Sequence, residues 1–115
     1  MTATPPLSDY VVVDLSSGIA GGYCTKLLAD GGAQVVEVEP SEGDPLRRWA
    51  ASGAEIAAGD DGALFSFLSS SKQSMVVDPD GDLGPLFALL ERADAVVWSK
   101  GSRLAEPVNH WVTGN

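Results

Sequence analysis

The chain has 115 residues, the length of one ordinary domain, with sixteen acidic residues against seven lysines and arginines and a formal net charge of −9. This acidic excess disfavours nucleic acid and anionic membrane surfaces as partners, because both are repelled at long range. A single cysteine excludes an internal disulfide framework. The start of the chain is too polar for a signal peptide, and no apolar run has membrane-spanning length, so we expect a soluble, cytoplasmic protein.

Residues 11–39 have the pattern of a strand, a helix and a second strand. Val11-Val12-Val13 is a β-branched run typical of a strand buried on both faces. Gly31 and Gly32 form a usual helix stop, and residues 34–39 alternate as a second strand does. A crossover this short implies that the two strands are parallel neighbours with a right-handed connection.

The helix between these strands has its apolar residues on one face, at Ala20, Tyr23, Cys24, Leu27 and Leu28. This spacing predicts a helix that packs one face against the sheet. Cys24 belongs to that face and has no histidine or cation near it in the sequence. We therefore expect Cys24 to be a buried core thiol and not a nucleophile.

The loop at residues 16–22 is the first candidate site, because open parallel sheets bind ligands at the carboxyl ends of their strands. Glycines at 18, 21 and 22 allow a ligand to approach the backbone closely, or they only let the helix pack on the sheet. A nicotinamide site is the sharper rival, with Glu39 as its ribose-binding acid. It requires G-x-G-x-x-G, which these glycines do not match.

The remaining elements follow from shorter patterns. Residues 45–51 suit a short helix, residues 53–62 a loop with at most a helical turn at 55–58, and residues 63–68 a strand or sheet edge. Residues 74–77 suit a strand that Pro79 ends, and residues 95–98 a final strand. Apolar residues at helical spacing predict the helix between them, at Leu83, Leu86, Phe87, Leu90 and Ala93, with Pro85 in its first turn.

Together these elements predict an α/β fold with an open, mainly parallel, Rossmann-like sheet and helices on both faces. Strands near Val11, Val36 and Val97 are expected to be parallel. The loops at residues 16–22 and 99–101 should then lie at the same edge of the sheet. No terminal element closes the sheet, so the chain is expected to be an incomplete, amino-terminal part of a larger fold.

Five groups of residues, in order along the chain, carry a resemblance to a known family: Asp14-Leu15-Ser16; Ala20-Gly21-x-Tyr23-Cys24-Thr25-x-Leu27-Leu28-Ala29-Asp30 with Gly32-Ala33-x-Val35-Val36-x-Val38-Glu39; Gly43-Asp44-Pro45-x-Arg47; Lys72-x-Ser74 with Asp78 and Pro79-Asp80-Gly81; and Ala93-Asp94-Ala95-Val96-Val97. They resemble the amino terminus of the family III CoA-transferases, or CaiB/BaiF family, which includes formyl-CoA and carnitine CoA-transferases and α-methylacyl-CoA racemase. The resemblance is clear over residues 8–101, whereas residues 102–115 form a tail of uncertain order.

The resemblance implies a two-domain enzyme of several hundred residues, usually an interlocked homodimer. Such enzymes transfer CoA between an acyl-CoA thioester and a carboxylic acid through intermediates on an aspartate. That aspartate lies downstream of the segments present here, so residues 1–115 are expected to supply part of the CoA-binding domain and no catalytic residue. Two alternatives stay open: an acyl-CoA racemase of the same family, and a non-catalytic degenerate homologue that acts as a scaffold.

The resemblance also implies where CoA lies. The backbone of Gly18, Ile19 and Ala20 is expected against the nucleotide end of CoA. Lys72 resembles a family lysine by its position, and Lys72 or Lys100 is expected near a phosphate. Ser99 and Lys100 follow the last strand, where a phosphate is expected. No metal site is expected.

Two features of this chain depart from the family pattern. Pro40 stands where the family commonly has a basic residue, and residues 98–102 replace the family's E-N-F-R-P-G. Because these are parts of the nucleotide site, we expect weak binding of CoA.

Overall fold

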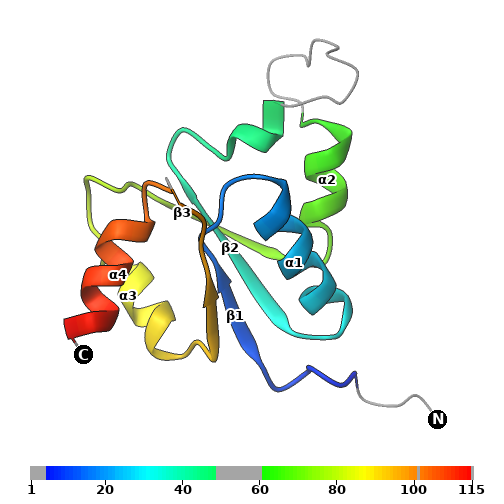
Figure 1. The fold of residues 1–115 in the computed structure, drawn as a ribbon, viewed down its shortest axis with the longest axis horizontal. Coiled ribbons are helices and arrows are strands. Elements are labelled where there is room, and N and C mark those ends of the chain that lie inside the picture. Colours follow the sequence, from blue (N-terminus) through cyan, green and yellow to red (C-terminus); the bar gives the residue numbers. More distant parts are fainter. Residues whose placement is uncertain (1–4, 49–60, 101, 115) are drawn as a thin grey trace.

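The computed structural model describes residues 5–48, 61–100 and 102–114, which form a four-stranded sheet between two layers of helices (Figure 1). The strands are β1 (Val11–Asp14), β2 (Gln34–Pro40), β3 (Gln73–Val77) and β4 (Ala95–Val97). Their order is β3-β2-β1-β4, and every neighbouring pair is parallel. The structure thus confirms the predicted α/β class and the open, parallel sheet.

Helices cover both faces of the sheet, as predicted. On one face lie α1 (Ile19–Asp30), α2 (Ala63–Ser69) and the 3-10 helix η1 (Pro45–Arg48), and on the other α3 (Gly84–Glu91) and α4 (Ala105–Gly114) (Figure 1). The chain changes face after β3, so that β4 pairs with β1 on the side away from β2. No helix in the described part of the chain is long and apolar enough to cross a membrane.

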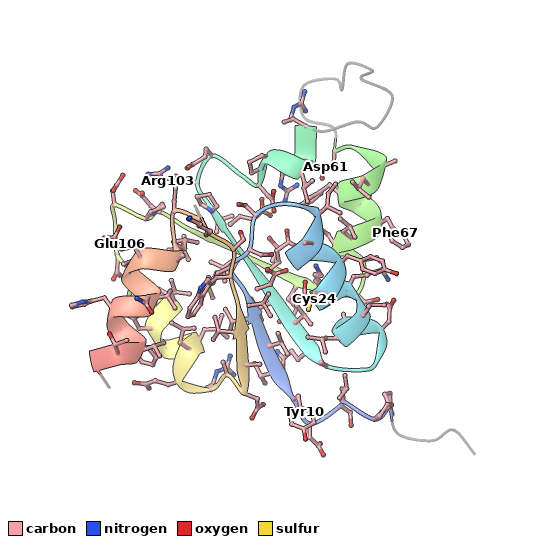
Figure 2. All side chains as sticks on the ribbon, in the orientation of Figure 1. Tyr10, Cys24, Asp61, Phe67, Arg103 and Glu106 are labelled. Carbon is pink, nitrogen blue, oxygen red and sulfur yellow. The ribbon has the colours of Figure 1, made fainter. Side chains whose placement is uncertain are left out.

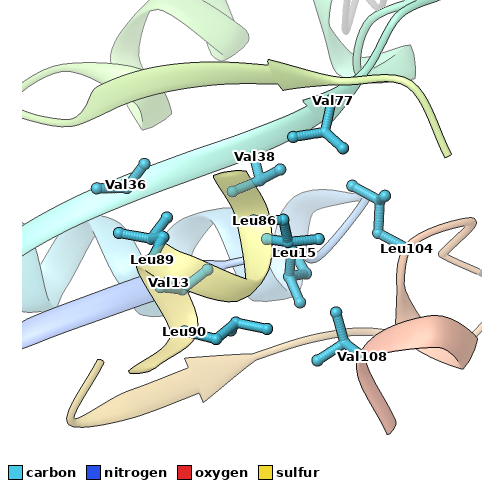
Figure 3. Packing of buried hydrophobic residues seen from close by; sticks show 10 residues of the cluster. All are labelled: Val13, Leu15, Val36, Val38, Val77, Leu86, Leu89, Leu90, Leu104 and Val108. Carbon is cyan, nitrogen blue, oxygen red and sulfur yellow. The ribbon is translucent and has the colours of Figure 1, made fainter. Parts of the chain in front are cut away.

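The larger hydrophobic core lies between the sheet and α3 (Figure 3). It joins residues from β1 to β3 to the inner side of α3 and to the segment around α4: Val13, Leu15, Val36, Val38, Val77, Leu86, Leu89, Leu90, Leu104 and Val108. Full burial of one such side chain contributes about 1.5–3 kcal/mol. This layer therefore supplies much of the free energy that holds α3 and the segment around α4 against the sheet.

The segment at residues 102–114 is an ordered part of this core, although its order was uncertain from the sequence. Leu104 and Val108 are at most 1% exposed. The ring of Trp111 in α4 stacks on that of Phe87 in α3, with the centroids 5.7 Å apart. The family resemblance noted in the sequence covered residues 8–101. It therefore gave no reason to expect that this segment would cover the sheet.

The orientation predicted for α1 is wrong. Its buried residues are Gly22, Thr25, Lys26 and Ala29. The apolar stripe of Ile19, Tyr23 and Leu27 is 47–55% exposed, and Cys24 is exposed as well (Figure 2). The physical reason lies in the sheet, whose α1 face carries buried carboxylates beside its valines, so polar and small residues pack there.

Two further predictions differ from the structure. Residues 63–68, predicted as a strand or edge, belong to α2, because Phe65 and Leu68 pack with Leu46 at helical spacing. The short helix predicted at 45–51 is a 3-10 turn at Pro45–Arg48. The remainder of that helix, the turn at 55–58 and most of the loop at 53–62 lie outside the described residues.

Candidate functional site

The loop after β1 meets the loop after β4 at the carboxyl edge of the sheet. The Ser17 N–H donates to Ser99 Oγ at 2.9 Å, and Ser99 Oγ donates to the Ser17 carbonyl at 3.1 Å. The two loops therefore share one edge, as predicted, although Gly101 lies outside the described residues. The chain adds β2 and β3 on one side of β1 and then β4 on its other side, so the strand order reverses between β1 and β4. Open α/β sheets bind ligands at such a topological switch point.

The glycines in the first loop have different functions. A Cβ at Gly21 would lie 2.2 Å from Ser16 Oγ, so only glycine lets Ser16 pack against α1. A Cβ at Gly22 would make an ordinary contact of 3.5 Å with Leu68. Gly18 has a φ of +107°, which favours glycine, and nothing lies within 4 Å of its Cβ position. Packing thus explains Gly21, whereas the backbone at Gly18 is open to a ligand.

Asp14 fixes the first loop from below. Its Oδ1 accepts hydrogen bonds from the Ser16 N–H at 2.9 Å and from Ser16 Oγ at 2.5 Å. Its Oδ2 accepts one from Thr25 Oγ1 at 2.5 Å, and Lys72 Nζ lies 3.4 Å away. Asp14 is only 2% exposed, so these bonds form where water competes little.

Lys72, one of the two lysines expected near a phosphate, lies buried beneath α1. Its side chain is 1% exposed, and Nζ donates to the carbonyl of Gly22 at 3.0 Å. The same nitrogen lies 3.8 Å from Glu37 Oε2, which also accepts a hydrogen bond from Ser69 Oγ. Burial raises the pKa of Glu37, and the nearby Lys72 opposes that rise. The Lys72 ammonium is therefore committed to internal carboxylates.

Glu39, the acid of the nicotinamide hypothesis, is also occupied. The Arg47 guanidinium donates to both its oxygens, at 2.6 and 2.7 Å, and the Asp44 N–H donates to Oε2 at 2.8 Å. Burial favours a higher pKa for the Glu39 carboxyl, but these hydrogen bonds hold the pKa below its ordinary value. No ribose hydroxyl is needed to satisfy this group, so the structure gives the nicotinamide hypothesis no support.

A small cleft of about 130 Å³ lies beside the first loop, above the ends of β1 and β2. Its lining includes Ser16, Ser17, Ser102 and Arg103. Ligand pockets usually measure roughly 300–1,000 Å³, so this cleft fits only a fragment of a cofactor-sized molecule. Arg103, which precedes α4 and is labelled in Figure 2, also pairs with Glu42. Ser102 belongs to the segment 98–102 that departs from the family pattern, whereas no motif in the sequence singled out Arg103.

The remaining expected residues lie on either side of this junction. Gly18 lines a second hollow with Pro45, while Ile19 and Ala20 begin α1 and are exposed. Ser99 and the exposed Lys100 line a third hollow, which faces α4. In the described segments no group of His, Cys, Asp and Glu side chains is arranged to hold a metal ion.

Comparison with known proteins identifies what the chain resembles. A model of CoA-transferase family III matches residues 7–104. The chain is 41% identical over 96 residues to a succinyl-CoA:mesaconate CoA-transferase of Haloarcula hispanica, covering 79% of this chain and 24% of that protein. It is 35% identical over 99 residues to a succinate–glutarate CoA-transferase of Agrobacterium fabrum, covering 81% and 24%.

A solved structure agrees with these sequence matches. A CaiB/BaiF family protein from Brucella suis superposes with a TM-score of 0.70 at 30% identity, over 84% of this chain and 26% of that one. The chain therefore spans about a quarter of the length of the relatives that it matches.

Proposed function

Because the chain belongs to CoA-transferase family III, we propose that it supplies part of a domain that binds CoA during transfer between an acyl-CoA and a carboxylic acid. The observation that carries this proposal is the junction of Ser17 and Ser99, beside an open Gly18 at the switch point. The relatives described above are named as transferases, which favours a transferase over a racemase.

In this proposal the nucleotide end of CoA lies along the backbone of Gly18, Ile19 and Ala20. Helix α1 has no side-chain cap and no acidic residue in its first turn, so its first N–H groups favour an anion. Ser99 and Lys100 lie across the junction, where a phosphate would face the end of β4. Lys72 takes no direct part, because its buried ammonium already has internal partners.

We further propose that this chain binds without catalysing transfer. The acids near the junction are engaged: Asp14 holds Ser16 and Glu39 holds Arg47, so neither is placed as a free nucleophile. The catalytic aspartate would come from sequence that follows the matched segment in the relatives. A cytoplasmic homodimer of the complete protein belongs to the same proposal.

Titration of CoA into the purified chain by calorimetry tests this proposal. A side chain at Gly18 has to adopt a strained φ, which costs about 1–3 kcal/mol or moves the loop. We therefore expect Gly18→Ala to weaken CoA binding about tenfold, a loss of about 1.4 kcal/mol. The matched control is Gly114→Ala in α4, where nothing lies within 4 Å of the new Cβ.

The outcomes separate the proposal from its alternative. Equal CoA affinity of the Gly18→Ala variant and the native chain would place the ligand elsewhere. No CoA binding by the native chain would favour a scaffold without the cofactor site. In either case a transfer assay from an acyl-CoA to a carboxylate is expected to show no turnover by this chain.

A further inference from the structure

Three charged side chains are buried together beneath α1. The carboxylates of Asp14 and Glu37 flank the single ammonium of Lys72, and each of these side chains is at most 8% exposed. Desolvation makes such a group expensive, and apolar residues of similar volume often stabilise a fold equally well. The arrangement is therefore poorly explained as a source of stability alone.

The hydrogen bonds of this group converge on the loop that begins the proposed CoA site. Asp14 Oδ1 holds both the backbone N–H and the hydroxyl of Ser16, while Oδ2 is held by Thr25 Oγ1. Thr25 is fully buried in α1. Since charge-assisted hydrogen bonds are roughly twice as strong as neutral ones, the carboxylate holds the loop to the helix through short, strong bonds.

The position of Ser16 also depends on the absence of a side chain at Gly21. The Ser16 Cβ and Oγ lie 2.3 and 2.2 Å from where a Gly21 Cβ would stand. Real Cβ contacts are never that short, so any side chain at 21 must push Ser16 away from its bond to Asp14. The two residues before Gly18 are thus fixed separately, Ser16 by Asp14 and Ser17 by Ser99.

We propose that Asp14, held by Lys72 and Thr25, is a positioning residue. Through Ser16, for which Gly21 leaves room, it presets the segment at residues 16–20 for CoA. This inference rests on the function proposed above. Presetting the loop lowers the entropy lost when CoA orders it, so it acts on affinity without any contact between Asp14 and the ligand.

The test compares two neighbouring glycines of α1. Gly21→Ala and Gly22→Ala gain the same helix propensity, but only the first forces Ser16 to move. Hydrogen exchange at the Ser16 amide reports the loop, and calorimetry reports CoA binding. We expect Gly21→Ala to speed this exchange and weaken CoA binding, each about tenfold, equivalent to about 1.4 kcal/mol. Gly22→Ala should change neither.

A second pair of variants, at Thr25, tests the inference independently if the Gly21→Ala variant does not fold. Thr25→Val removes the hydroxyl that holds Asp14 Oδ2, whereas Thr25→Ser keeps it. Thr25→Val should speed Ser16 exchange and weaken CoA binding, whereas Thr25→Ser should leave both at their native values.

The two readouts separate the possible failures. If Gly21→Ala and Thr25→Val leave Ser16 exchange at the native rate, Asp14 does not preset the loop, whatever happens to CoA. If the loop loosens but affinity for CoA stays native, the preset loop does not serve binding, and the inference is overturned while the proposed function stands. If the native chain binds no CoA, the proposed function fails and the inference fails with it.

Discussion

Ser99 Oγ accepts a hydrogen bond from the N–H of Ser17 and donates one to the carbonyl of the same residue, although the two serines are 82 positions apart. One hydroxyl thus joins the loops that follow β1 and β4. The bridge sets the distance between the open backbone at Gly18 and the cation of Lys100 on the far side of the junction.

Removing this bridge should loosen the carboxyl edge of the sheet. Ser99→Ala loses two hydrogen bonds worth roughly 0.5–1.5 kcal/mol each, partly replaced by water at this exposed site, so we expect the free energy of unfolding to fall by about 1 kcal/mol. Chemical denaturation measures the change. Ser66→Ala in α2 is the control, and an equal effect of both variants would show that the bridge contributes nothing.

Local patterns in the sequence were sufficient for the sheet and for this junction. A β-branched run predicted β1, alternation predicted β2, and helical spacing predicted α1 and α3. The rule for parallel strands brought Ser17 and Ser99 to one edge. Each of these conclusions depends on residues close together in the sequence.

The errors have a different origin, because they depend on partners far apart in the sequence. Lys72 was expected at the CoA site, but its partners are Asp14, 58 positions away, and Glu37. Those carboxylates make one face of the sheet polar, which reverses the side of α1 that is buried and exposes Cys24. No spacing within α1 contains that information.

Glu37 should make stability fall as pH rises. Its pKa is raised in the folded protein above 4.5, chiefly by burial, so the folded state binds the proton more tightly than the unfolded state. The stability from this group is complete below the unfolded pKa and is lost as pH rises through the folded pKa. Glu37→Gln should therefore gain stability over the native chain as pH increases from about 4.5 towards neutrality.

The check is a series of denaturation curves at several pH values for both proteins, since titrating groups remote from Glu37 cancel in the difference. Glu37→Gln keeps an oxygen that can accept from Ser69 Oγ. A difference that does not change with pH would contradict the assignment of this titration to Glu37.

Arg47 should be essential for stability because it neutralises a buried acid. The Glu39 side chain is 3% exposed, and Arg47→Met would leave its charge unpaired, at a cost of about 3–5 kcal/mol. Urea denaturation measures the loss, with the exposed Arg92→Met as the control. Destabilisation of Arg47→Met by less than about 1 kcal/mol would mean that water or another cation replaces the guanidinium.

The exposed stripe of α1 should cause self-association. Tyr23 and Leu27 are more than half exposed, and Phe67 of α2 is exposed as well, so a large apolar surface faces solvent. We expect sedimentation velocity to show concentration-dependent association that Leu27→Glu weakens. The exposed Ala88→Glu in α3 is the control. A native chain that stays monomeric at high concentration would contradict this expectation.

The most direct test of the central claim is a titration of CoA into isotopically labelled chain at low and at moderate salt, followed by amide chemical shifts. We expect saturable shifts at Gly18, Ile19, Ala20 and Ser99. We also expect tighter binding at moderate salt, because salt screens the repulsion between CoA and a chain of net charge −9. Shifts confined to other parts of the chain, or no shifts at saturating CoA, would contradict the claim that this junction holds the nucleotide.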